Sequence, residues 1–245
     1  MFWEHAHGWQ EQRIVLGNQV RRLSADIPIL QAAMLRVNPG TAWQMLHALG
    51  KLPKGTWIAQ NAANSGVGHC VIEIATYLGL KTLNFVRRPS AIDDLHQLGA
   101  DAVFLDDDDG LASALTILGT DRAVLALNAV GGDSATRLSK TLARHGLHLT
   151  YGAMSRSPLV IKNRSLIFDD IRYQGFWLKH WLSSATLDER ERTYSTLENL
   201  MSVGLLHQPV DSVYPLSDYA NALNRLKAAD RSGKVLFGAD TGIAL

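Results

Sequence analysis

Cysteine, net charge and long apolar runs are all scarce in this sequence, and each scarcity excludes a class of protein. A single cysteine, Cys70, excludes a disulfide framework and a cysteine-rich zinc site. The formal net charge is +1, which excludes a protein built to coat nucleic acid or anionic lipid. No apolar run reaches the roughly 18 residues that span a bilayer, and the opening residues have no apolar secretion core. We therefore expect a soluble, cytoplasmic protein without a nucleic-acid or membrane partner.

What is present is an alternation of short apolar runs and helical patterns, which is typical of βαβ units and a parallel sheet. The expected strands span residues 57–60, 83–86, 102–105, 123–127 and 147–151, with a last one at 234–237. The apolar residues of 67–78 recur with the spacing of a helix that packs on a sheet, and Gly79 ends it. Further helices are expected from a cap at Asp26 to Asn38, over 41–49, 135–143 and 187–206, and after Ser217.

The turn after the first strand reads Asn61-Ala62-Ala63-Asn64-Ser65-Gly66-Val67-Gly68 and opens directly into a helix. A helix that begins in this way offers unpaired N–H groups and the positive end of its dipole to a pyrophosphate. The GxGxxG spacing is kept only in part, because Ala63 and Ser65 stand at its first two glycine positions and Gly68 at its third. The order of strand, turn and helix strengthens the prediction of a dinucleotide site.

Two arginines, Arg87 and Arg88, follow the second strand, where an NAD-selective site places a carboxylate. Two guanidinium groups at that point suit the 2′-phosphate of NADPH. The alternative, solvated charges at the end of a strand, stays open on spacing alone.

Other polar groups have a plain structural explanation. The charged run at 188–192 is expected to be a solvated helix face, and Asp106 to Asp109 a solvated loop. His5, His7 and His69 are expected to be solvated or packed rather than ligands, so we predict no metal site. Cys70 is expected to be a small packed residue.

Five segments together resemble the mitochondrial-type trans-2-enoyl thioester reductases, on the zinc-free side of the medium-chain dehydrogenase/reductase superfamily. They are VNPGTAW at 37–43, QNAANSGVG at 60–68, NFVRR at 84–88, YGAM at 151–154 and GFWLKHW at 175–181. The resemblance extends over nearly the whole chain. It implies an NADPH-dependent oxidoreductase that reduces the 2,3 double bond of an enoyl-CoA or enoyl-acyl-carrier-protein.

The resemblance also implies a set of cofactor-binding residues. Asn38 would lie near the nicotinamide, and 64–67 would hold the pyrophosphate. Taken alone, Phe176 and Trp177 would be core aromatics and Lys234 a surface lysine. The complete set is Asn38, Asn64, Ser65, Gly66, Val67, Arg87, Arg88, Tyr151, Gly152, Ala153, Met154, Phe176, Trp177, Leu178, Lys179 and Lys234.

The catalytic residue is not assigned, because no tyrosine in this sequence matches the tyrosine that the family uses to deliver a proton. The resemblance implies that this tyrosine belongs to a GroES-like domain of which only a remnant is present. The expected fold is therefore an α/β, Rossmann-type doubly wound parallel sheet beside that remnant. Residues 1–25 would be the remnant, 26–181 the NADPH-binding domain, and 182–245 helices and a strand that pack back as part of the catalytic domain.

The resemblance further implies a homodimer that pairs its sheet domains edge to edge. The first functional hypothesis is thus an enoyl thioester reductase, with CoA or acyl carrier protein bearing the substrate, and a quinone or alkene reductase as a near variant. The second hypothesis is a module that binds NADPH or a partner and has no catalysis of its own.

Overall fold

The computed structural model describes residues 1–3, 8–228 and 230–238, and they form two units. The first unit comprises residues 1–37 and 184–245, and the second comprises 38–183. Residues 26–37, which the sequence groups with the nucleotide-binding domain, belong to the first unit. His5 and His7 lie outside the described residues.

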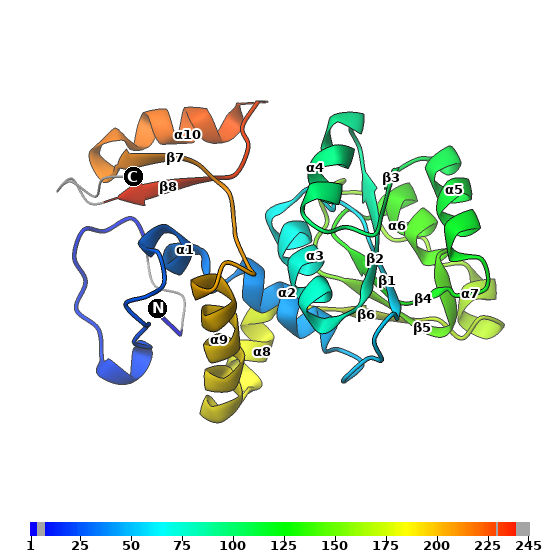
Figure 1. Cartoon of the computed structure of the whole chain (residues 1–245), viewed down its shortest axis with the longest axis horizontal. Helices are drawn as coiled ribbons and strands as arrows, with labels where there is room; N and C mark the ends of the chain where they lie inside the picture. The colour runs from blue at the N-terminus through cyan, green and yellow to red at the C-terminus, as the bar shows by residue number, and fades with distance from the viewer. Residues whose placement is uncertain (4–7, 229, 239–245) are drawn as a thin grey trace. The chain divides into compact units, whose positions relative to one another are not determined.

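The second unit is a parallel six-stranded sheet with strand order β3-β2-β1-β4-β5-β6 (Figure 1). This order reverses between β1 and β4, so the doubly wound fold expected from the sequence is confirmed. The strands are β1 Trp57–Gln60, β2 Lys81–Val86, β3 Ala102–Leu105, β4 Ala123–Asn128, β5 Leu142–Thr150 and β6 Arg172–Gly175. The helices are α2 Asn38–Leu46, α3 Gly66–Leu78, α4 Ile92–Gln97, α5 Asp108–Leu118, α6 Gly132–Ser139 and α7 Asn163–Ile167, with α8 Leu178–Ser184 at its end and the 3₁₀ turn Pro89–Ala91 before α4.

Two apolar clusters hold the helices of this unit on the sheet. One joins α5 and α6 to strand residues such as Phe85 and Ala126, and the other joins Ile72 of α3 and Leu95 of α4 to Val86. Each fully buried aliphatic or aromatic side chain contributes roughly 1.5–3 kcal/mol of transfer free energy. The sheet edge that carries the dinucleotide turn is therefore fixed by apolar packing on the helices.

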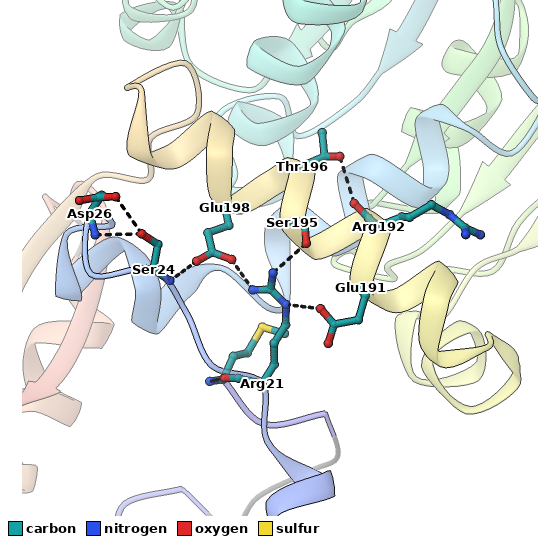
Figure 2. Close-up of polar contacts among 9 residues, drawn as sticks. Arg21, Ser24, Asp26, Glu191, Arg192, Ser195, Thr196 and Glu198 are labelled. Carbon is teal, nitrogen blue, oxygen red and sulfur yellow. Dashed lines mark hydrogen bonds and ion pairs between the residues drawn. The ribbon is translucent and has the colours of Figure 1, made fainter.

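The first unit contains α1 Ile29–Met34, α9 Leu187–Ser202 and α10 Tyr219–Lys227. It also has the parallel pair β7 Val210–Pro215 and β8 Lys234–Gly238, and the 3₁₀ turns Gly17–Gln19 and Leu216–Asp218. Figure 2 shows how Arg21 joins the N-terminal segment to α9: it pairs with Glu191 and Glu198 and donates to Ser195. The run at 188–192 is therefore not only a solvated face, because Glu191 binds Arg21.

Several boundaries differ from the sequence-based expectation. Helix α2 begins at Asn38, where the sequence suggested a helix end before Pro39, because a proline in the first helical turn has no N–H to lose. Helix α1 is capped by Pro28, without a side-chain bond from Asp26. Helix α6 ends at Ser139, and β5 then begins at Leu142 and continues through Gly146 with a register shift against β4.

The aspartates at 106–109 do not form a solvated loop. Asp106 accepts from Ser134 Oγ at 2.5 Å and from Arg137 Nε at 2.9 Å. Asp107 caps α5 by accepting from the Gly110 N–H, and Asp108 begins that helix. Their charges complement the positive end of α5 and bind α6 to the end of β3.

Candidate functional site

The N-terminus of α3 follows the turn after β1, and some of its backbone N–H groups are available to a ligand. Ser65 caps the helix, and its Oγ accepts from the Gly68 N–H at 3.1 Å. Within the described chain, the N–H groups of Gly66 and Val67 have no acceptor. Unpaired N–H groups at the positive end of a helix form an anion site, so this turn can bind a pyrophosphate.

The turn before α3 is tight enough to require its one retained glycine. A Cβ on Gly68 would lie 2.2 Å from the Ala63 carbonyl oxygen, a contact that backbone cannot relieve. Ala62 has a φ of 47°, in the left-handed region that a residue with a side chain seldom adopts. Gly68 therefore performs the third-glycine role that its spacing predicts, close helix–strand packing.

A buried polar network connects the strand ends around this turn. Asn61 Nδ2 donates to Asn128 Oδ1 and to Ser134 Oγ, each at 2.8 Å, and Asn61 Oδ1 accepts from the Ala129 N–H. Asn128 Oδ1 also accepts from the Gly131 N–H, and its Nδ2 donates to Thr150 Oγ1. The network joins the carboxyl ends of β1, β4 and β5, where ligands of doubly wound sheets bind.

Sequence reasoning did not identify this network. Asn61 follows β1 and Asn128 ends β4, and both are fully buried. The signal was present: a polar residue at the end of an otherwise apolar strand has to find a partner when it is buried.

Arg87 and Arg88 follow β2 directly, and both are exposed. Neither side chain has a hydrogen bond or ion pair in the part of the chain that the structure describes. Because β1 and β2 are parallel neighbours, these arginines lie at the same sheet edge as the α3 turn. Their donors are free to bind an anion there.

The segment 151–154 connects to the loop after β4 by backbone bonds. Tyr151 N–H donates to the Asn128 carbonyl, and Met154 N–H donates to the Ala129 carbonyl, each at 3.0 Å. A Cβ on Gly152 would lie 2.7 Å from the Ala129 oxygen, so the segment approaches this loop as closely as its glycine allows. The segment therefore joins the same edge of the sheet.

The Tyr151 hydroxyl is buried, and no residue within 1–3, 8–228 and 230–238 meets it with good hydrogen-bond geometry. Burial, partly offset by the neighbouring Ser65, raises the pKa of Tyr151 to about 12. The side chain is therefore a protonated donor at neutral pH, beside the cap of α3.

The segment 176–179 follows β6 and continues this edge. Phe176 N–H donates to the Thr150 carbonyl at 2.8 Å and is half-buried, whereas Trp177 is 55% exposed and meets Lys179 and His180. Leu178 is buried. Trp177 is thus not a core aromatic.

Two of the expected contacts belong to elements outside the six-stranded sheet. Asn38 is the buried first residue of α2, and Lys234 begins β8 of the first unit, so their roles toward a cofactor remain predictions. Cys70 is fully buried, as expected for a packed residue. Over the described residues, no group of three or more histidine, cysteine or carboxylate side chains is placed to hold a metal, and no helix is long and apolar enough to cross a membrane.

Comparison with known proteins agrees with this geometry. Residues 66–195 match the family model described as zinc-binding dehydrogenase. The human protein named mitochondrial enoyl-[acyl-carrier-protein] reductase is 39% identical over 88% of this chain and 59% of its own length. The Caenorhabditis elegans protein of the same name is 36% identical over 94% of this chain and 68% of its own. The solved Etr1p complex with NADP and crotonyl-CoA superposes with a TM-score of 0.75 at 28% identity, covering 82% of this chain and 60% of that one.

The sequence-based expectation of a cytoplasmic protein is wrong, because the relatives are named mitochondrial. A low cysteine count and the lack of a long apolar run are equally compatible with a mitochondrial protein, so composition did not decide the compartment.

The chain spans about three fifths of the length of the human protein, so this relative shows similarity over only part of its own length. Identity above 35% to a relative of which two thirds is covered, the matching dehydrogenase model and the shared fold all point the same way. The chain belongs to the mitochondrial-type enoyl-acyl-carrier-protein reductase family, within the zinc-binding dehydrogenase domain family.

Proposed function

We propose that the second unit binds NADPH along the carboxyl edge of its sheet and takes part in reducing the 2,3 double bond of trans-2-enoyl thioesters. The observation that carries this proposal is the α3 turn: within the described residues, the N–H groups of Gly66 and Val67 and the side chains of two nearby arginines have no partner. Asn64 to Val67 would hold the pyrophosphate, and Arg87 and Arg88 the 2′-phosphate.

The other segments of this edge would border the nicotinamide and its ribose. Segments 151–154 and 176–179 are both anchored by backbone bonds, at Asn128, Ala129 and Thr150, so they offer fixed groups to a ligand. Bound NADPH would supply the hydride, and this chain would supply orientation and a fixed polar surface. Asn38 and Lys234 are proposed as further contacts. We assign no catalytic residue to this chain.

The cofactor assignment is tested by titration of NADPH and NADH. Replacing both Arg87 and Arg88 by alanine should weaken NADPH binding tenfold or more and leave NADH binding nearly unchanged, because each charge-assisted phosphate contact contributes about 1.5–3 kcal/mol. The double variant Lys51→Ala, Lys54→Ala removes two exposed charges that precede β1, at the opposite edge, and serves as the control. Equal losses for the two cofactors would refute the assignment.

The reaction is tested by following NADPH oxidation with a short enoyl-CoA. We expect NADPH binding but little turnover, because none of the tyrosines in this sequence matches the proton-delivering tyrosine of the family. Turnover of about 1–1,000 per second, the usual enzyme range, would show that groups within these 245 residues complete the reaction. Failure to bind NADPH at all would refute the proposed site.

A homodimer is the partner that we propose for this fold. Strand β6 pairs only with β5 among the described strands, so β6 is an edge strand whose outer backbone groups can pair with another chain. The segment beside it is tied to β6 by Ser165 Oγ and Tyr173 OH at 3.1 Å. It exposes the apolar side chains Leu159, Val160, Ile161, Leu166, Ile167 and Phe168.

Sedimentation tests the dimer. The variant Ile167→Lys, Phe168→Lys should sediment as a monomer where the parent chain is dimeric, because it places two charges in the apolar segment. The matched control is Ile117→Lys on α5, which is also exposed. A parent chain that is monomeric at micromolar concentration would refute the proposal.

A further inference from the structure

The amino ends of β4, β5 and β6 lie at the edge of the sheet opposite to the α3 turn (Figure 1). Residues around these ends line a second charged feature of the sheet unit. It is a cavity of about 460 Å³. Strand β4 has six residues, and at about 3.3 Å per residue its length separates the two edges by roughly 20 Å. The cavity is therefore not part of the proposed NADPH site.

The lining of this cavity is strongly basic. Its charged members are Arg122, Lys140, Arg144, Lys162, Arg164 and Asp169, a formal excess of four positive charges. The whole chain carries a formal net charge of only +1, so the cavity concentrates charge that the rest of the molecule balances. A concave site lined by one sign of charge focuses the field and attracts ligands of the opposite sign.

Among the described residues, only one ion pair involves a cation of this cavity. The lone carboxylate, Asp169, lies 3.9 Å from Arg164, whose side chain is 82% exposed, so this contact is weak. Arg122 Nη1 is buried and has no hydrogen-bond partner among the described residues. A buried guanidinium donor without a partner is costly, so no protein group on the described chain offsets the charge of Arg122 at this atom.

The basic side chains come from four separate segments around the cavity. Arg122 precedes β4, Lys140 follows α6, Arg144 lies in the shifted register of β5, and Lys162 and Arg164 lie at the start of α7. Such a ring suits several phosphates better than a single carboxylate, because each cation can contact a different oxygen.

The remaining lining supplies an apolar wall from Leu142 and Ile171, which lie outside the segment proposed for dimerisation. Ligand pockets for small molecules measure about 300–1,000 Å³ and combine apolar walls with a few polar groups. We propose that this cavity is a second binding site, for a polyphosphorylated nucleotide that places its phosphates among the cations and its base against the apolar wall. Two sources share this chemistry: a free nucleoside triphosphate, and the phosphorylated adenosine end of coenzyme A.

Equilibrium titration of the full chain at low salt tests the site with ATP, coenzyme A and inorganic tripolyphosphate. We expect ATP and coenzyme A to bind with micromolar to low millimolar dissociation constants, more tightly than tripolyphosphate, and without displacement by saturating NADP⁺. The tighter of the two nucleotides identifies the source. Tripolyphosphate binding as tightly as both would refute the nucleotide assignment, and lack of binding by all three would refute the site.

Charge-removing variants locate the binding. Lys140→Gln with Arg144→Gln should weaken ATP binding at least tenfold, and both residues are exposed and lie outside the segment proposed for dimerisation. Two controls should bind as the parent does: Lys51→Gln with Lys54→Gln, and Arg87→Ala with Arg88→Ala. Equal weakening of ATP binding in the lysine variant would mean that ATP is attracted non-specifically. Loss of ATP binding in the arginine variant, or displacement of ATP by NADP⁺, would place ATP in the NADPH site. Either result overturns the proposal.

A variant of Arg122 distinguishes a role in binding from a structural role through the melting temperature measured with and without ATP. Arg122→Met should leave the melting temperature of the free protein unchanged or higher, because it removes a buried donor that has no partner among the described residues. The same variant should lose the rise in melting temperature that ATP gives the parent. A variant that melts lower when free yet keeps the full rise with ATP would show that Arg122 is structural, and would overturn its role in the site.

Discussion

The two units of the chain differ in the contacts that join their segments. The sheet unit has two apolar clusters on its parallel strands, whereas the first unit combines buried apolar residues such as Leu35, Leu197 and Leu200 with polar contacts between segments far apart in sequence. Arg21 reaches Glu191 and Glu198 of α9, and Tyr194 OH donates to the Arg36 carbonyl at 2.8 Å. Apolar patterns are visible in a sequence and specific long-range polar pairs are not, so the two units differ in how far they can be predicted.

The polar contacts of the first unit are buried, which makes them important for its stability. The Gln31 side chain donates to the Gln208 carbonyl and accepts from the Gln208 N–H, each at 2.9 Å, and Gln208 Nε2 donates to the Met34 carbonyl. Both glutamines are buried, so loss of either leaves groups without partners. The following variants test whether each unit depends on the contacts described.

The largest effect is expected at Gly68 of the sheet unit. Gly68→Val would force a side chain against the Ala63 carbonyl and should lower the free energy of unfolding by about 4 kcal/mol or more. Denaturant unfolding measures it, and hydrogen exchange should show lost protection in β1 and α3. The control is Gly175→Ala, whose added Cβ would meet nothing nearer than 4.0 Å. A well-folded Gly68→Val variant of parental stability would contradict the tight turn.

Arg21→Ala should have the next largest effect, in the first unit. The side chains of Arg21 and Glu198 are only 9% and 10% exposed, so removal of the arginine leaves a buried carboxylate unpaired. Breaking such a pair costs about 3–5 kcal/mol. Hydrogen exchange should localise the loss to α9 and leave the sheet strands protected. Arg192→Ala, at an exposed position of the same helix, should change little.

His148 should make the sheet unit sensitive to acid. Its ring is buried against Tyr173, and burial lowers its pKa to about 4. Because the unfolded chain takes up this proton near pH 6.5, stability is complete above that pH and falls by about 3 kcal/mol as the pH approaches 4.

His148→Phe separates this contribution from those of other groups. Unfolding free energies of parent and variant, measured from pH 7 to pH 4, should converge as the pH falls. Parallel curves would show that His148 does not contribute to the acid sensitivity.

The smallest effect concerns the glutamine pair of the first unit. Gln31→Ala should cost about 1–3 kcal/mol, because it leaves the buried N–H and carbonyl of Gln208 without the Gln31 side chain. Gln208→Ala should cost a similar amount, because it removes the donor to the Met34 carbonyl. The two side chains bond different partners, so the losses should add within about 0.5 kcal/mol. A larger coupling in a double-mutant cycle would mean that the two side chains depend on each other.

The spacing of apolar residues was sufficient to predict most strands and helices of the sheet unit. The strands β1, β3 and β4 and the helix α3 occur where apolar spacing and Gly79 predict them, because their burial depends on period and length alone. The boundary between α6 and β5 was not predicted, since Gly146 marks a register shift rather than a strand start. A bulge is a property of two paired strands, and one strand's sequence does not show it.

The candidate site likewise has parts that the sequence predicted and parts that it did not. The α3 turn and the two arginines could be placed from their spacing along β1 and β2. The Asn61–Asn128 bridge could not, because it joins strands that are neighbours only after the chain crosses the sheet. The basic cavity was missed for the same reason, as its cations are scattered from residue 122 to residue 164.

The order of strands and helices, the parallel sheet and the anion-binding turn at the start of α3 follow from apolar periodicity and glycine placement over short stretches of the chain. Which buried polar groups meet depends on the folded arrangement of the strands and helices. Asn61 finds Asn128, Arg21 finds Glu198 and Arg122 Nη1 finds no partner within the described residues. The physical reason is that a buried polar group must be paired somewhere, while its partner is chosen by the folded geometry and not by its neighbours in the chain.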